Sequence, residues 1–236
     1  MKIEQLKRIF KFLEEKEEHK VPFIIKVKCE IPFTKEELNV KHSLYLRFSR
    51  IKSLPEGLKV RGGLDLQRSS IESLPEDLKV GGDLYLNNSQ INSLPEGLKV
   101  GGNLNLEEIG ITSLPEGLEV GSHLNLSQTQ ITSLPEGLKL GGGLTLDSSN
   151  ITHLPEGLEV KGNLNLRNCK SLTSLPEGLK VGKWLSLSSS KITSLPKGLE
   201  VGDDLFISWT TLTKYTDNEL RGMIKPGFIK GEIVRK

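Results

Sequence analysis

Residues 94–113 read LPEGLKVGGNLNLEEIGITS, and close copies of this 20-residue string follow one another from Leu54 onward. Its Leu-x-Leu segment begins at nine leucines, which stand at 44, 64, 84, 104, 124, 144, 164, 185 and 205. Its Leu-Pro pair recurs eight times, at 54, 74, 94, 114, 134, 154, 175 and 195. A short fixed period of this kind is the sequence signature of a solenoid, in which each repeat forms one coil.

The apolar residues of one period predict the core of the coil. Leu64 and Leu66 alternate as the inward side chains of a strand, because successive strand residues point to opposite faces. Further apolar residues follow at Ile71, Leu74, Leu78 and Val80. Six side chains bury too little area to offset the entropy of ordering 20 residues, so one repeat cannot fold alone and the coils must stack.

Two further positions of the repeat lie at turns, and in a stack of coils each of them forms a column of equivalent residues. Gly57 and its equivalents follow the Leu-Pro pair, where a positive φ is expected, and Asp77 is expected to adopt the same left-handed conformation in the second repeat. Five residues after each strand leucine the chain places a small hydroxyl or thiol, which we expect to bond the backbone of the adjacent coil. This column holds Ser49, Ser69, Ser89, Thr129, Ser149, Cys169, Ser190 and Thr210, and Ile109 interrupts it.

The pattern Leu-x-Leu-x-x-(Ser/Thr)-x-Ile-x-x-Leu-Pro-x-x-Leu resembles the leucine-rich repeat family. Its 20-residue period is similar to the short bacterial class of that family, known from secreted effectors and from bacterial and phage repeat proteins. The resemblance covers about residues 43–213 and implies a rigid binding module. Some effectors of this class carry a ubiquitin-ligase domain with a nucleophilic cysteine, but the 23 residues after Thr213 contain no cysteine.

The predicted fold class is an α/β repeat solenoid, a right-handed coil with one parallel sheet and few helices. Residues 1–42 are predicted to form an N-terminal cap with a helix at 3–18, a strand at 23–31 and a degenerate half-repeat at 33–42. Residues 43–213 hold about nine strands, with a one-residue insertion near 169–172. Residues 214–236 form a C-terminal cap, with a short helix at 217–224 and a closing strand at 228–234.

Composition excludes several classes of protein. Charged residues make up 26% of the chain, the net charge is +2 and alanine is absent, so a mainly helical fold and general coating of nucleic acid are disfavoured. No run of 18 apolar residues and no signal peptide is found, so the expected location is cytoplasmic, with signal-less secretion as an effector left open. Cys29 and Cys169 are expected to be free thiols.

The search for catalytic motifs predicts a protein that is not an enzyme and binds no cofactor. No phosphate-binding loop, dinucleotide-binding glycine motif, His-Glu-x-x-His or Gly-x-Ser-x-Gly is present. His42 and His123 lie four repeats apart, at roughly 19 Å for a strand spacing of ~4.8 Å, too far to share a metal ion. Cys169 belongs to the hydroxyl column, where packing is a simpler explanation than catalysis.

The outward side chains of the strands vary from coil to coil, and there we expect the function to lie. The candidate partner-binding residues are Tyr45, Arg47, Phe48 and Arg68 in the first coils, Tyr85, Glu107 and Glu108 in the middle, and Trp184, Phe206 and Trp209 in the last coils. Exposed Trp and Arg often dominate protein interfaces, which suggests a protein partner that the chain inhibits or scaffolds. Packing of the last three aromatic residues under the C-terminal cap is the alternative.

Three other functions stay open at this point. The arginines of the first coils suggest an acidic, phosphorylated or nucleic-acid partner, although the acidic middle would repel a nucleic-acid backbone. The chain is also compatible with the recognition subunit of an effector enzyme. We expect a monomer that does not bind membranes, and the open ends of a parallel sheet leave self-association as a further alternative.

Overall fold

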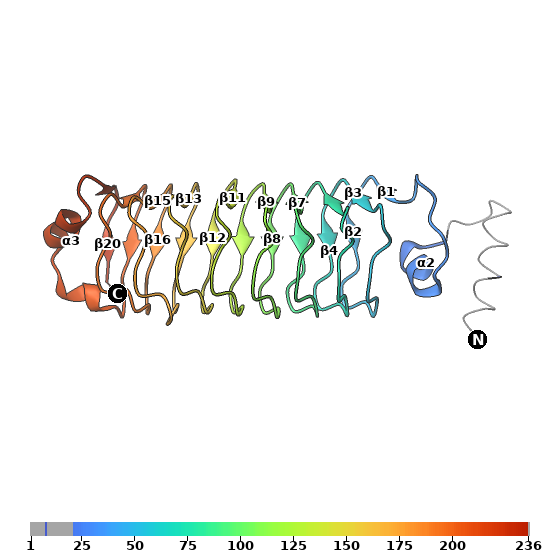
Figure 1. Cartoon of the computed structure of the whole chain (residues 1–236), viewed down its shortest axis with the longest axis horizontal. Coiled ribbons are helices and arrows are strands. Elements are labelled where there is room, and N and C mark those ends of the chain that lie inside the picture. Colours follow the sequence, from blue (N-terminus) through green and yellow to red (C-terminus); the bar gives the residue numbers. More distant parts are fainter. Residues whose placement is uncertain (1–7, 9–20, 236) are drawn as a thin grey trace.

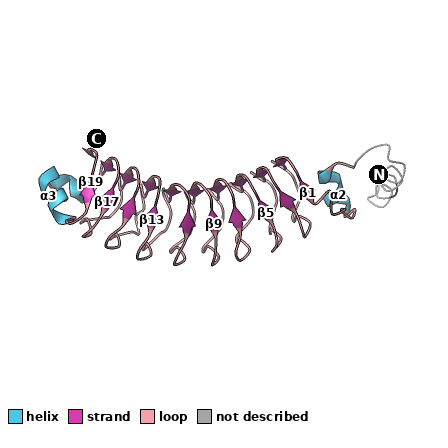
Figure 2. Ribbon diagram, turned by 90° about the horizontal axis from the view of Figure 1, so that it is seen from above, coloured by secondary structure: helices cyan, strands magenta, loops and turns pink. Residues whose placement is uncertain are grey.

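The computed structural model describes residue 8 and residues 21–235. The coils stack along one axis into a gently curved rod, with a helix near each end of the described part (Figures 1 and 2). Each full coil contributes one short strand to each of two parallel sheets. The parallel repeat solenoid with few helices that the 20-residue period predicts is therefore confirmed, and a second sheet is added to the one expected.

The first sheet runs the length of the stack with ten strands in chain order. Its strands are β2 (Leu44–Tyr45), β4 (Leu64–Asp65), β6 (Leu84–Tyr85), β8 (Leu104–Asn105), β10 (Leu124–Asn125), β12 (Leu144–Thr145), β14 (Leu164–Asn165), β16 (Leu185–Ser186), β18 (Leu205–Phe206) and β20 (Ile233–Val234). Each strand leucine lies opposite the next, and Leu164 lies opposite Leu185 across the one-residue insertion. The insertion is therefore absorbed outside the strands, at the exposed residues Lys170 and Ser171.

The second sheet consists of two sections. The first section holds β1 (Asn39–Val40), β3 (Lys59–Val60), β5 (Lys79–Val80), β7 (Lys99–Val100), β9 (Glu119–Val120) and β11 (Lys139–Leu140). The other section holds β13 (Glu159–Val160), β15 (Lys180–Val181), β17 (Glu200–Val201) and β19 (Phe228–Ile229). β1 pairs with β3 in register, as expected for a degenerate half-repeat before the first full coil.

The six apolar positions of each coil form one continuous core. Leu64, Leu66 and Ile71 are fully buried, and their equivalents pack against one another from Leu46 to Ile233. The buried residues of successive coils belong to a single cluster, so each coil packs its apolar side chains against those of its neighbours. The core therefore depends on stacking, as the short period predicts.

A column of glycines after the second sheet lets neighbouring coils approach closely. A Cβ atom on Gly81 would overlap the carbonyl oxygen of Arg61, and one on Gly121 would overlap that of Gly101. The backbone N–H of Gly121 donates to the carbonyl oxygen of Val100 at 2.8 Å in the same region. Lys161 takes the glycine position in the coil where the second sheet is interrupted, between β11 and β13.

Two expectations about the turn columns are wrong. The hydroxyl groups of Ser69, Thr129 and Thr210 donate to carbonyl oxygens three residues earlier in their own coil, at 2.6–2.7 Å, because the strand turns sharply at this point. Among the hydrogen bonds described for this column, that of the Cys169 thiol alone reaches a carbonyl of the preceding coil, that of Leu146 at 3.1 Å. Asp77 does not have a positive φ, and its carboxylate accepts a hydrogen bond from the N–H of Gly57 instead.

The N-terminal strand expected at 23–31 is also wrong, because Phe23–Cys29 forms helix α2. The apolar residues that alternate in sequence occupy two sides of this helix. Phe23, Ile24 and Val27 pack against the solenoid core, whereas Ile25 and Cys29 belong to a second, smaller cluster. Because this helix is apolar on two sides, its sequence shows the alternation of apolar residues that is typical of a strand. The helix expected at 3–18 lies outside the described residues, apart from Arg8.

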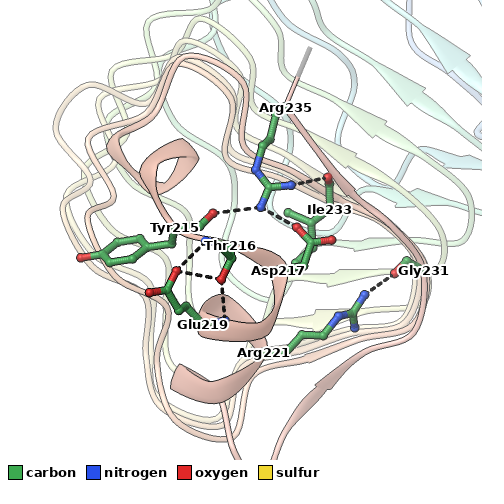
Figure 3. A network of polar contacts seen from close by, with 8 residues as sticks. All are labelled: Tyr215, Thr216, Asp217, Glu219, Arg221, Gly231, Ile233 and Arg235. Atoms are coloured by element: carbon green, nitrogen blue, oxygen red, sulfur yellow. Dashed lines mark hydrogen bonds and ion pairs between the residues drawn. The ribbon is translucent and has the colours of Figure 1, made fainter.

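Helix α3 (Asp217–Met223) forms where the sequence predicts a short helix, and a 3-10 helix that was not expected, η1 (Thr211–Lys214), precedes it. The side chains of Thr216 and Glu219 form a capping box at the start of α3 (Figure 3). The expected closing strand is instead two strands, β19 and β20, which extend the two sheets separately. Their spacing equals that of β3 and β4, so residues 228–234 are half of a further coil.

Two arginines fasten this cap to the last coil. Arg235 donates to the carbonyl oxygens of Ile233 and Tyr215 at 3.1 Å and pairs with Asp217 at 2.5 Å (Figure 3). Arg221 donates to the carbonyl oxygens of Ile229 and Gly231. Guanidinium groups therefore satisfy carbonyl groups at the end of the stack, which a sheet edge would otherwise leave unpaired. In the described part of the chain, every helix is too short or too polar to cross a membrane.

Candidate binding face

The outer surface of the first sheet carries one side chain per strand that points away from the core. The residue between the two inward leucines of each coil is Tyr45, Asp65, Tyr85, Asn105, Asn125, Thr145, Asn165, Ser186 or Phe206. The flanking leucines, such as Leu64 and Leu66, have no exposed surface. Alternation along the strand therefore directs these nine residues outward, as expected. We call this surface, together with the turn that follows each strand, the first face.

A sharp turn follows each strand of the first face. In the first coil, the N–H of Ser49 donates to the carbonyl oxygen of Leu46 at 3.2 Å, and Phe48 between them has a φ of 55°. The same left-handed conformation recurs in all nine coils. We call this column the strand-exit ridge, and it consists of Phe48, Arg68, Asn88, Glu108, Gln128, Ser148, Asn168, Ser189 and Trp209. This conformation has no signal in the sequence, because no glycine marks it.

The first coils bring Tyr45, Arg47, Phe48 and Arg68 together, as expected. Tyr45 is 74% exposed and Phe48 is 67% exposed. The Arg68 guanidinium lies 6.0 Å from the centre of the Phe48 ring, within the range of a cation–π contact. Arg47 forms an ion pair with Asp65, which is only 3% exposed. This carboxylate offsets the positive charge of Arg47.

Tyr85 extends the same group into the third coil. Its hydroxyl donates to Asp83 Oδ2 at 2.9 Å, and this hydrogen bond is the main reason that the pKa of Tyr85 is raised. Asp83 also accepts a hydrogen bond from the N–H of Asn103 in the next coil, at 2.7 Å. Tyr85 is therefore held in place on the face as a hydrogen-bonded, half-buried residue.

The middle of the face is polar and acidic. Glu107 accepts a hydrogen bond from the Asn125 amide at 3.3 Å, whereas Glu108 projects from the strand-exit ridge and is exposed. His123 lies nearby and contacts the Thr145 hydroxyl at 2.9 Å, and burial lowers the pKa of this histidine. Asn, Ser and Thr residues fill most of the remaining outward positions.

The last coils carry the aromatic cluster that the sequence predicts. Trp184 and Phe206 are half-buried and meet edge to face, with ring centres 6.1 Å apart and an interplanar angle of 87°. Phe206 lies opposite Val234 of the cap. Trp209 is 85% exposed, so packing under the C-terminal segment does not account for it. The alternative of cap packing is therefore wrong for Trp209 and holds only in part for Phe206.

The ten predicted residues form groups at separate places along one face. The aromatic residues at the two ends occupy the same columns, because Tyr45 and Phe206 are strand residues and Phe48 and Trp209 belong to the ridge. Eight strand spacings of ~4.8 Å separate these ends, a span of roughly 38 Å. Two depressions of the described surface lie away from this face, one along the second sheet and one beside α2.

The titratable groups that could support chemistry are dispersed or inert in the described part of the chain. Among the described residues, no three His, Cys, Asp or Glu side chains gather closely enough to hold a metal ion. Both cysteines are free and buried. Burial raises the pKa of the Cys169 thiol to about 11, so the thiolate that a nucleophile requires is scarce near neutral pH.

No family model matches the chain, and a search of curated proteins found no match to it. The function must therefore be argued from the residues of the face itself.

Proposed function

We propose that this chain is a non-catalytic protein-interaction module of the leucine-rich repeat type, which binds a partner protein through the first face. The bacterial or phage origin and the cytoplasmic location expected from the sequence belong to this proposal. The observation that carries it is Trp209, a large apolar side chain left 85% exposed in the same coil as Phe206, which meets Trp184 edge to face. Trp is among the residues that most often dominate the binding energy of protein interfaces.

The composition of the face supports a protein as the partner. Binding surfaces of antibodies are rich in Tyr, Ser and Asn, with Trp and Arg as anchors, because these residues combine rigid contact area with adaptable hydrogen bonds. Tyr45, Tyr85 and the Asn and Ser residues at other outward positions give the first face the same character. A rigid stack of coils also loses little conformational entropy when it binds.

The acidic and nucleic-acid alternatives receive less support from the structure. Arg47 is paired with the buried Asp65, and Glu107 and Glu108 occupy the middle of the same face. A nucleic-acid backbone along the face would meet these carboxylates, and binding of that kind needs a net positive surface.

The test is capture from the lysate of the native host, followed by affinity measurement with the protein recovered. The intact chain is compared with Trp184→Ala/Trp209→Ala and with Lys99→Ala/Lys139→Ala, a matched double variant on the second sheet. We expect the tryptophan variant to weaken binding by about 30-fold or more and the lysine variant to bind normally. Equal binding by all three folded proteins would refute the proposal.

A further inference from the structure

Two columns of the solenoid have a left-handed backbone. Glycine occupies every left-handed position of one column and none of the other. In the turn after the Leu-Pro pair, every left-handed residue is glycine, with φ between 64° and 77°. These glycines are Gly57, Gly97, Gly117, Gly137, Gly157, Gly178 and Gly198. Where Asp77 replaces glycine, the left-handed conformation is absent. This column therefore follows the steric rule that glycine supplies positive φ.

The strand-exit ridge breaks that rule in all nine coils. Its φ values lie between 51° and 60°, yet none of its residues is glycine and only Asn88 and Asn168 are asparagine. Side chains in this region clash with their own backbone, most severely when they are bulky, as Phe48 and Trp209 are. Residues held in such conformations are concentrated at functional sites.

Contacts within the ridge do not explain why these side chains are present. Arg68 lies over Phe48, and the Asn168 amide donates to the Ser148 hydroxyl at 3.0 Å. The side chains of Glu108 and Gln128, by contrast, are exposed and make no hydrogen bond or ion pair with another described residue. Glycine at these two positions would relieve the backbone without the loss of any such contact.

We propose that the strand-exit ridge determines which protein the first face binds, and that the partner is a folded protein that spans the ridge from Phe48 to Trp209. This inference rests on the proposed function. The distance between the two anchors, roughly 38 Å, suits a partner surface of about 800 Å². A small molecule would need a concave pocket, and neither the depression along the second sheet nor the one beside α2 is lined by a ridge residue.

The charges of the ridge specify the chemistry of that partner. Arg68 and Glu108 are both exposed and lie two coils apart, at roughly 10 Å for a strand spacing of ~4.8 Å. The partner therefore presents an acidic group opposite Arg68, a basic group opposite Glu108 and an apolar pocket for Trp209. Complementary charges of this kind select a partner by repelling surfaces with the wrong pattern.

The first arm of the test needs no partner and measures thermal unfolding of Glu108→Gly, Gln128→Gly, Glu108→Ala and Gln128→Ala. We expect the glycine variants to melt no lower than the parent chain and about 2 °C above the alanine variants. If the glycine variants melted more than about 3 °C below the parent, the side chains would be structural and the inference would be overturned.

The second arm measures the dissociation constant of the captured partner for Glu108→Gly, Glu108→Lys and Arg68→Glu. We expect an increase of at least about 10-fold for each charge reversal and a smaller one for glycine, with no loss of folding. If the tryptophan variant lost the partner while these ridge variants bound it normally, the ridge inference alone would fail. If the tryptophan variant bound normally as well, the proposed function would fail with it.

Discussion

The two sheets are built by the same repeat, but their outward residues follow different rules. On the second sheet, the outward strand residue is Lys or Glu in eight successive coils, and Lys99, Glu119 and Lys139 form ion pairs along this column. On the first face, the equivalent residue is aromatic, acidic, amide or hydroxyl in turn. A column that repeats one chemistry serves the coil and its solubility. A column that changes from coil to coil carries information for a partner.

The largest expected effect tests the packing that both sheets share. Gly121→Ala places a Cβ atom against the carbonyl oxygen of Gly101, which cannot move without a shift of the neighbouring coil. We expect a loss of about 3 kcal/mol in the free energy of unfolding, measured by denaturant titration. Gly110→Ala is the control, because no atom lies within 4 Å of a Cβ atom there. Similar losses at both positions would show that close approach of the coils is not what requires glycine.

A smaller effect on stability distinguishes an ion pair of the first face from an ion pair of the second sheet. Arg47→Ala leaves the buried Asp65 carboxylate with only the N–H of Gln67 at 3.2 Å, and we expect a loss of about 2 kcal/mol. Lys139→Ala should leave stability almost unchanged, because Glu119 is partly exposed and keeps Lys99. Recovery of stability in Arg47→Ala/Asp65→Asn would identify the unpaired charge as the cause. Equal losses for the two single variants would contradict the distinction.

The smallest effect concerns the thiol beneath the first face and depends on pH. The pKa of Cys169 is raised by burial to about 11, so the folded state favours the protonated thiol. The stability that this raised pKa contributes is fully present below the ordinary thiol pKa, near 9, and is lost as the pH rises towards 11. At pH 10 we expect the parent chain to have lost about 1 kcal/mol relative to its value at pH 8. Cys169→Ser should lack this loss, and parallel pH profiles for the two proteins would exclude the thiol as its source.

The sequence alone predicts the coil more fully than it predicts the face. Leu64, Leu66 and Ile71 could be assigned to the core because their spacing repeats in every coil, and repetition averages out local exceptions. Helix α2 was missed because Phe23 and Ile25 pack against different clusters, which period alone does not reveal. Asp65 was missed because its burial depends on Arg47 across a neighbouring strand.

The ridge shows the same limit in another form. A left-handed turn is normally recognised by Gly or Asn, and Glu108 or Trp209 gives no such signal. The available clue was a comparison of equivalent positions. This turn recurs in nine coils without a glycine, although the chain contains 24 glycines. The exposure of Trp209 likewise gives no signal in the sequence, because the neighbouring Phe206 lies opposite the cap whereas Trp209 remains exposed.

The most direct test of the central claim blocks each face of a single coil in turn. Both native cysteines are buried, so Gln128→Cys on the ridge and Lys139→Cys on the second sheet each provide one reactive thiol for a polyethylene glycol maleimide. The partner's dissociation constant is then measured before and after labelling. We predict that the label on residue 128 weakens binding at least about 10-fold and that the label on residue 139 leaves it unchanged. Loss of binding only when residue 139 is labelled would contradict the assignment of function to the first face.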